Sequence, residues 1–368
     1  MKITLKNTPE QVELVKAMAS RNRDVAYEAQ TALAEFIGPV LAEVVNNAPV
    51  LSNLFTTLQY NADDNPSIPL DLYFDITDQD YVQVYSQSRA GGLPTSEVLP
   101  TSSELKIATY SLDSAVSFDR RYAAKSRMDV VAKTMTRVAQ EILLKQNKIS
   151  ANVVMKALAN ASTNGLAHVE AASSAGRFTL ADLNELLTLA KRISTSFVGG
   201  TPEVGQGRGI TDILVSPEIV EELRAIAYNP INTKAAPLAG ALKNPVQTAD
   251  VIAQQAYSAA GAPEFYGINV IELNELGFTT NGAQAFNTVF EENYAGTFNA
   301  TSENIVVGLD RTRDSLIRPV AVDGESGGEF NLIADDQYSI RQSKIGYFGS
   351  LEEGRIVLDD RALVGKIV

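Results

Sequence analysis

The sequence contains few side chains that could carry out catalysis. It has no cysteine and a single histidine, His168, which excludes disulfides, thiolate nucleophiles and every mechanism or metal site that needs two imidazoles. His168 lies in a stretch of small residues with no serine nucleophile motif beside it. We therefore expect a histidine on the surface or in a loop, and not a catalytic base.

Acidic clusters are the remaining candidates for chemistry. Asp63-Asp64, Asp78-Gln-Asp80 and Asp335-Asp336 could hold a hard cation weakly, but none has the spacing of a twelve-residue calcium loop. We expect solvated acids in turns, no metal and no cofactor. Carboxylate pairs suited to glycoside hydrolysis stay open, although a chain without tryptophan is a poor platform for sugars. A protein that is not an enzyme is the first expectation, and a cytosolic hydrolase is the enzyme alternative.

Positive charge gathers in one segment of an acidic chain. The net charge is −13, yet the segment from Arg120 to Asn160 holds nine basic residues against two acidic ones. Lys133, Arg137 and Lys148 lie on one side of the helix predicted there, away from its apolar stripe. This basic face has three readings: a solvated surface, a contact with acidic neighbours, or a weak, salt-sensitive and sequence-independent contact with nucleic acid.

The N-terminal half of the chain reads as a helix followed by a long hairpin. Thr8 and Pro9 predict a helix start, and apolar spacing carries the helix, whole or broken, to about residue 46. Residues 66–118 then alternate apolar and polar positions on both sides of a Gly-Pro turn, which predicts an extended two-stranded hairpin. Two strands cannot stabilise themselves in water, so the hairpin must lie on its own subunit or, as we favour, on a neighbouring copy.

A long helix is predicted next, from about residue 123 to 158. One stripe of apolar side chains follows helical spacing and is expected to face a core: Val131, Met135, Val138, Ile142, Ile149 and Val153. Small residues from 165 to 176 then suggest a boundary between domains.

The C-terminal half mixes both kinds of element. Thr179 with Asp182 is a helix capping pair, and a strand from 210 to 215 leads into a helix that starts at Ser216-Pro217-Glu218. Further elements follow the same rules of spacing: a helix near 247–258, strands near 269–273, 285–291, 305–309, 315–322 and 336–348, and a closing apolar segment at 355–368.

The order of these elements resembles the capsid fold shared by major capsid proteins of tailed bacteriophages, the herpesvirus capsid floor and bacterial encapsulins. Two stretches add to the resemblance: 212–218 is similar to a strand and helix start of the family's axial domain, and 339–362 to its terminal strands. The implied fold is α+β, with an N-terminal arm (1–65), an extended loop (66–118), a peripheral domain with the spine helix (119–177 and 310–368) and an axial domain (178–309).

The resemblance implies a structural protein without catalysis, which self-assembles into the hexamers and pentamers of an icosahedral head around double-stranded DNA. It implies assembly in the host cytoplasm, a place in the virion capsid, and portal, scaffolding and cement proteins as further partners. Within the loop, we expect Arg89, Gly91, Gly92 and Pro94 to contact a neighbouring subunit, and the basic face to line the interior.

Other shells and other partners are weighed against this expectation. An encapsulin-like compartment has the same fold and stays open as the alternative. No apolar run is long enough to cross a bilayer, so no membrane partner is expected. Some members of the family cross-link a loop lysine to an asparagine of a neighbour. Here Lys106 is the one lysine of 66–118 and no asparagine follows Asn331, so we expect no cross-link.

Overall fold

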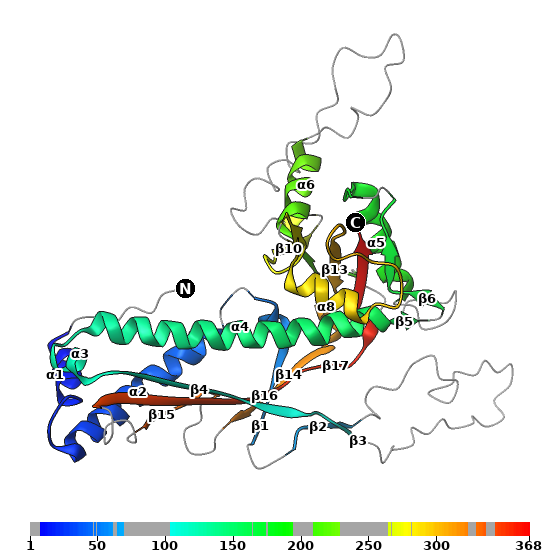
Figure 1. The fold of residues 1–368 in the computed structure, drawn as a ribbon. Coiled ribbons are helices and arrows are strands. Elements are labelled where there is room, and N and C mark those ends of the chain that lie inside the picture. Colours follow the sequence, from blue (N-terminus) through cyan, green and yellow to red (C-terminus); the bar gives the residue numbers. More distant parts are fainter. Residues whose placement is uncertain are drawn as a thin grey trace, which may run out of the picture. The chain divides into compact units, whose positions relative to one another are not determined.

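The computed structural model describes residues 8–46, 48, 50–61, 65–69, 104–163, 165–173, 176–193, 209–228, 264–265, 267–280, 282–322, 329–335 and 343–368. The chain divides into two compact units (Figure 1). Unit 1 comprises Met1–Ile68, Leu105–Ser150 and Leu316–Ile356, and unit 2 comprises Pro69–Glu104, Ala151–Ser315 and Val357–Val368.

Unit 1 begins with the predicted helix, which is broken in two. Helix α1 (Pro9–Ala17) starts where the Thr8 side chain accepts a hydrogen bond from the Gln11 amide, and α2 (Arg23–Asn46) follows after a turn. A single turn of 3-10 helix, η1 (Leu51–Leu54), leads into strand β1 (Thr56–Asn61). Later in the chain come α3 (Arg120–Ala124) and the long helix α4 (Met128–Asn160), which confirms the predicted spine helix.

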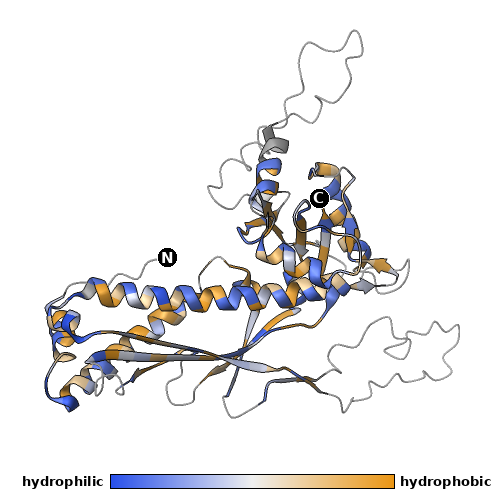
Figure 2. Ribbon diagram, in the orientation of Figure 1, coloured by the Kyte–Doolittle hydropathy of each residue, from blue (hydrophilic) through white to orange (hydrophobic). Residues whose placement is uncertain are grey.

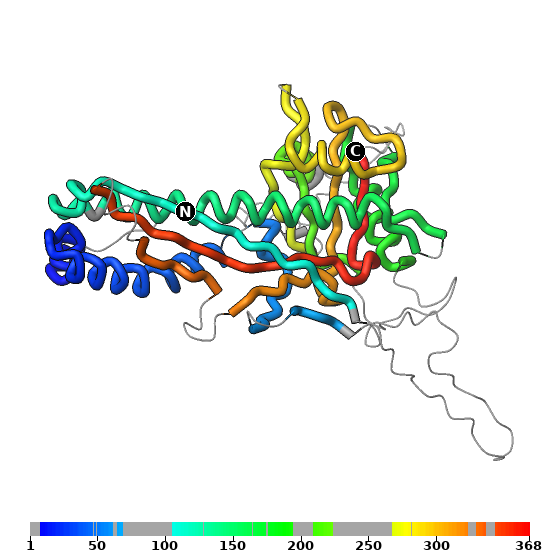
Figure 3. The backbone as a smooth tube through the Cα atoms, turned by 60° about the horizontal axis from the view of Figure 1, so that its bottom comes forward, coloured from blue at the N-terminus to red at the C-terminus, as the bar shows by residue number. Residues whose placement is uncertain are grey.

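The sheet of unit 1 is organised around one long strand, β16 (Lys344–Gly354). Strand β4 (Thr109–Asp119) pairs with β16 antiparallel along its full length, and the two run side by side in Figure 3. Strands β15 (Asn331–Asp335) and β14 (Leu316–Val322) also pair with β16, while β1 lies parallel to β14, and the short β17 (Ile356–Val357) pairs with β14.

This pairing changes the interpretation of the hairpin's second strand. Residues 109–119 belong to the sheet of unit 1, because their hydrogen bonds go to the C-terminal strand β16. The hairpin itself is described only at its base, where β2 (Ser67–Pro69) pairs with β3 (Glu104–Lys106) and the side chains of Ile68 and Ile107 are buried. The rest of the predicted hairpin lies outside the described residues.

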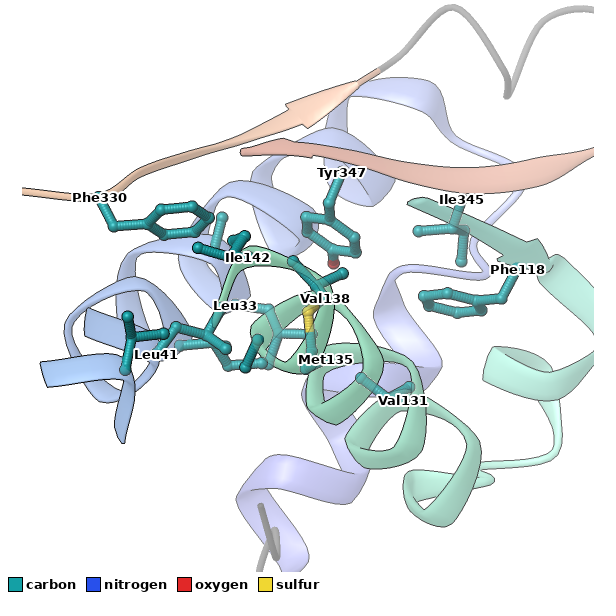
Figure 4. Close-up of a cluster of buried hydrophobic side chains, with 14 of the residues drawn as sticks. Leu33, Leu41, Phe118, Val131, Met135, Val138, Ile142, Phe330, Ile345 and Tyr347 are labelled. Atoms are coloured by element: carbon teal, nitrogen blue, oxygen red, sulfur yellow. The ribbon is translucent and has the colours of Figure 1, made fainter. Parts of the chain in front are cut away.

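The core of unit 1 lies between α2, α4 and the sheet (Figure 4). Helix α4 alternates apolar and polar bands along its length (Figure 2). The first four residues of the predicted stripe, Val131, Met135, Val138 and Ile142, are buried in this core, as predicted. Ile149 and Val153 are only half-buried. Gln146, Asn147 and Ser150 are buried beyond Ile142; Gln146 donates to Glu353 of the sheet, and Ser150 Oγ donates to the Gln146 carbonyl of the same helix.

Unit 2 contains a mixed six-stranded sheet with the order β7-β18-β13-β8-β10-β9. Its strands are β7 (Val169–Ala171), β8 (Asp212–Val215), β9 (Glu264–Phe265), β10 (Ile268–Glu272), β13 (Ile305–Leu309) and β18 (Leu363–Ile367). Every residue of β8, β13 and β18 is buried. The apolar faces of α5 (Leu180–Ile193) and α6 (Pro217–Tyr228) pack on this sheet.

Short elements complete unit 2: the strand pairs β5 (Ser162–Thr163) with β6 (Leu166–Ala167) and β11 (Phe278–Thr279) with β12 (Gly282–Ala283), and the 3-10 turns η3 (Arg311–Arg313) and η4 (Asp360–Ala362). Both predicted helix starts are confirmed. The Asp182 amide donates to Thr179 Oγ1 at 3.3 Å while Asp182 Oδ2 accepts from the Thr179 amide at 2.8 Å, and the Ile219 amide donates to Ser216 Oγ at 3.4 Å.

Three predictions about this half of the chain are corrected. Residues 285–291 form a helix, α8 (Ala285–Asn293), and not a strand, because Phe286 and Phe290 are buried at helical spacing. The stretch 165–176 contains β7, a sheet strand paired with β18, and is not a simple linker. The segment 310–368 divides at Ile356, because β18 pairs with β13 in unit 2. The helix expected at 247–258 lies outside the described residues.

Candidate assembly surfaces

The predicted basic face is present on α4. Lys133, Arg137 and Lys148 are exposed, on the side of the helix away from the buried stripe. In the described part of the chain no ion pair joins any of these three cations to a carboxylate. Within the described residues, therefore, no acidic side chain of the same chain pairs with this face. The positive charge of the face is available to another molecule.

An exposed leucine stands in the middle of this basic face. Leu144 is 60% exposed, and it precedes Lys148 by one helical turn. Glu141 and Arg137 lie on the same side, one and two helical turns before Leu144. Exposure of a leucine side chain to water is unfavourable. The face therefore combines three cations with an apolar side chain that another molecule could cover. This signal was readable in the sequence once the helix position was known.

Helix α2 carries a second exposed apolar surface. Val25, Tyr27, Phe36 and Val40 are all exposed, and Phe36 is 53% exposed. On the outer face of the sheet, Ile333 of β15 and Phe348 of β16 are direct cross-strand partners and are also exposed. By helical spacing Val25, Phe36 and Val40 share one side of α2, and apolar surface that is contiguous in this way is a candidate contact with another molecule. The sequence reasoning did not single out either group.

A buried ionic cluster ties together four elements of unit 1, namely β16, β14, α4 and β4. Glu353 is fully buried; its Oε2 accepts from Arg318 Nε at 2.7 Å and its Oε1 from Arg355 Nη2 at 3.1 Å. Gln146 of α4 donates to Oε2 at 3.0 Å and the Tyr110 hydroxyl of β4 to Oε1 at 2.8 Å. Burial alone would raise the pKa of Glu353, but the two arginines and these bonds outweigh it and lower the pKa.

The two arginines connect this cluster to the N-terminal segment. Arg318 Nη1 donates to Asn46 Oδ1 at 3.2 Å, at the end of α2. Arg355 Nη1 donates to the Ser52 carbonyl at 3.0 Å, and its guanidinium lies 5.1 Å from the centre of the Phe55 ring. The cluster therefore fixes the end of α2 and the start of β1 on the sheet, and its role is structural.

His168 lies in the bend between β6 and β7, as a loop residue would, but it is fully buried and not on the surface. Its amide donates to the Ala161 carbonyl and its carbonyl accepts from the Gly365 amide, which hold it between the β5–β6 hairpin and β18. Its Nε2 lies 2.9 Å from Thr163 Oγ1. Burial lowers the pKa of His168 and keeps the ring neutral. The ring therefore has no exposed surface through which it could contact a substrate.

Most of the other residues considered for chemistry lie outside the part of the chain that the structure describes. Asp335 is described, whereas the other residues of the three acidic clusters lie outside the described residues. No group of three or more histidine, aspartate or glutamate side chains in the described part of the chain could hold a metal ion. Gly324–Gly328 has the Gly-x-Ser-x-Gly spacing of a nucleophile elbow, but it connects the strands β14 and β15, where an elbow needs a strand followed by a helix.

Two further findings concern the predicted contacts. The loop residues Arg89, Gly91, Gly92 and Pro94 lie outside the described residues, so their contact with a neighbour remains a prediction. Among the described helices, none is both long enough and apolar enough to span a membrane.

Comparison with known proteins gives matches to solved structures alone. No protein-family model matches the sequence, and no curated protein matches it. The capsid of an empty GTA particle matches with a TM-score of 0.51 and 12% sequence identity over 87% of this chain and 90% of that chain. The capsid of the native GTA particle matches with a TM-score of 0.51 and 10% identity over 87% and 89%.

An encapsulin complex from Synechococcus elongatus PCC 7942 also matches, with 12% identity over 86% of this chain and 85% of that chain. Its TM-score is 0.46, and we draw no conclusion from this match. The likeness to the two GTA capsids covers nearly the whole chain and agrees with the order of elements read from the sequence. This chain therefore has an α+β fold similar to that of the two GTA capsids.

Proposed function

We propose that this chain is the major capsid protein of a tailed bacteriophage, a structural subunit without catalysis. The observation that carries the proposal is the shared fold with the GTA capsids over 87% of the chain. In this proposal the subunits form hexamers and pentamers of an icosahedral head that encloses double-stranded DNA. The head assembles in the host cytoplasm, with portal, scaffolding and cement proteins as further partners.

The exposed apolar groups of unit 1 support a subunit that is completed by its neighbours. Phe36 of α2 and Leu144 of α4 each leave more than half of their surface exposed. In a shell, copies of the chain cover such surfaces at every symmetry-related contact, so that modest areas add up to a stable particle. We propose a contact between the loop and a neighbouring subunit of the same shell, through Arg89, Gly91, Gly92 and Pro94.

We assign the basic face of α4 to the interior of the particle. Lys133, Arg137 and Lys148 would contact the phosphate backbone without reading bases, which gives weak and salt-dependent binding to any sequence. Replacing all three by glutamate should reduce packaged DNA or the yield of particles. Replacing exposed Lys16, Lys125 and Arg177 in the same way is the matched control. Normal particles with a normal DNA content from the first variant would refute this assignment.

The test of the overall proposal is the state of assembly of the full-length chain. We expect shells in negative-stain images and a fast-sedimenting species, either from the chain alone or with scaffolding partners. Monomers under every condition, including in extracts of infected cells, would refute a shell subunit. An encapsulin-like compartment is the alternative, and the contents of purified particles distinguish the two: genomic DNA supports the phage head and a cargo enzyme supports the compartment.

A further inference from the structure

A cationic cavity lies within unit 1, beside the turn between α1 and α2. It has a volume of about 190 Å³, and its lining includes Arg21, Arg23, Arg120 and Lys344. Among the described residues that line it there is no carboxylate. Like charges around one small space favour an anion between them, and we consider Arg21, Arg120 and Lys344 as the cations that could hold it. The basic face of α4 contributes none of these residues, so the cavity is a separate feature.

The fold itself brings two of these cations together. Arg120 directly follows β4 and Lys344 begins β16, and the two strands pair so that Lys344 faces Asp119. The Arg120 amide donates to the Ser343 carbonyl at 3.2 Å. Its side chain donates to the Ala19 carbonyl from Nε at 3.1 Å and from Nη2 at 2.9 Å. These two bonds use two of the five N–H groups of the guanidinium and fix its plane against the turn.

The carboxylate that interacts with Lys344 already has a partner. Asp119 accepts from Arg121 Nη2 at 2.9 Å, and this bond contributes most to the lowered pKa of Asp119, to which Lys344 also contributes. Asp119 is therefore already paired with Arg121, which weakens its interaction with Lys344. Arg21 and Lys344 therefore retain the capacity to bind an external anion.

A buried amide gives independent support for a ligand. Gln30 of α2 borders the cavity and is only 3% exposed. No hydrogen bond joins its side chain to another residue within the described ranges. Buried amides normally have partners, and an amide that borders a cavity can complete its bonding with water or with a bound group.

The start of α2 adds to the positive potential. Asn22 Oδ1 accepts from the Asp24 amide and Ser20 Oγ from the Asn22 amide, both at 3.2 Å, so the turn opens the 24-residue helix α2 next to the cavity. The N-terminal end of a helix carries partial positive charge and favours anions, although the Asp24 carboxylate in the first turn of α2 offsets part of this charge. Ser20 also lines the cavity, and its hydroxyl keeps its own hydrogen to donate.

We propose that this cavity binds a phosphate group, held by Arg21, Arg120, Lys344 and the amide of Gln30. A phosphate suits the site because its several oxygens accept bonds from different directions, and guanidinium groups pair with it in a fork. The group can come from two sources, a free phosphate compound such as inorganic phosphate or the backbone of a nucleic acid. The site does not depend on assembly, so it can be tested on the unassembled chain.

The test is calorimetric titration of the full-length chain with inorganic phosphate and, separately, with short double-stranded DNA. The variant Arg21→Gln/Lys344→Gln removes two cations, and Gln30→Leu removes the buried amide at nearly constant volume. The matched control, Lys16→Gln/Lys125→Gln, removes two exposed cations outside the cavity. Circular dichroism checks that each variant is folded, and a chloride titration at equal ionic strength checks that the effect is not one of salt.

We expect saturable phosphate binding to the original chain and to the control. Affinity should fall at least tenfold in the double variant and several-fold in Gln30→Leu. Weaker DNA binding in the same variants identifies a nucleic acid backbone as the source, and unchanged DNA binding identifies a free phosphate compound. Phosphate binding that is absent, or equal in the double variant and the control, would overturn the proposal. So would a loss of assembly without a change in phosphate affinity, which would mean that the cations contact a carboxylate of another copy.

Discussion

Replacing Glu353 by glutamine should destabilise unit 1 strongly while changing the shape of the side chain very little. All groups that bond to Glu353 are donors: Arg318, Arg355, Gln146 and Tyr110. A glutamine amide would turn an N–H₂ group toward one pair of these donors and leave two buried guanidinium groups without a counter-charge. Removal of one partner from a buried ion pair costs about 3–5 kcal/mol. Because glutamine keeps one acceptor oxygen, we expect about 3 kcal/mol.

The neighbouring residue provides a matched control. Glu352 is half-buried and accepts from the Tyr60 hydroxyl at 3.2 Å and from Thr109 Oγ1 at 3.0 Å, both neutral donors. Glu352→Gln should therefore cost about 1 kcal/mol, as for an ordinary hydrogen bond. Urea unfolding followed by far-ultraviolet circular dichroism measures both variants. At a slope of about 3 kcal/mol per molar urea, Glu353→Gln should lower the midpoint by about 1 M.

The pH dependence of this difference is a second readout. The pKa of Glu353 is lowered in the folded state, so its stabilisation is complete above the ordinary glutamate pKa of about 4.3. It is lost as the pH falls further, through the pKa of the folded state. Equal free energies of unfolding for Glu353→Gln and Glu352→Gln at neutral pH would refute the buried ion cluster as a stabilising element.

Three further predictions address other parts of the chain. A Cβ atom on Gly349 would collide with the Phe330 ring, so Gly349→Ala should lower the free energy of unfolding by about 1–3 kcal/mol. The loss should be smaller when Phe330 is also replaced by leucine. Equal losses with and without Phe330→Leu would contradict the collision. Burial lowers the pKa of His168, so the thermal midpoint should fall as the pH drops below about 6.5. His168→Gln should remove this slope, and an unchanged slope would contradict the assignment. Deletion of 90–94 should leave the circular dichroism spectrum of the subunit unchanged and stop shell assembly in sedimentation, whereas insoluble protein would place the loop in the subunit's own core.

Local patterns in the sequence predicted the elements whose signals lie within one segment. The capping pair Thr179–Asp182 and the helix start at Ser216 depend on neighbours three residues away, and both are confirmed. The stripe from Val131 to Ile142 follows from helical spacing alone. Residues 285–291 were misread because a short apolar run fits a strand or a helix until Phe286 and Phe290 are seen to share one buried face.

The sequence by itself determined that this chain is an α+β protein, with an N-terminal helix, a long amphipathic helix with a basic side, and elements in the order of a capsid subunit. Its missing cysteine and single histidine also removed most catalytic mechanisms. Only the tertiary structure decided which segments meet. Glu353 and Gln146 are 207 positions apart, and β4 finds its partner more than two hundred residues later. The burial of a charge, and the gathering of Arg21, Arg120 and Lys344 around one cavity, depend on such long-range pairing, which no local period of the sequence encodes.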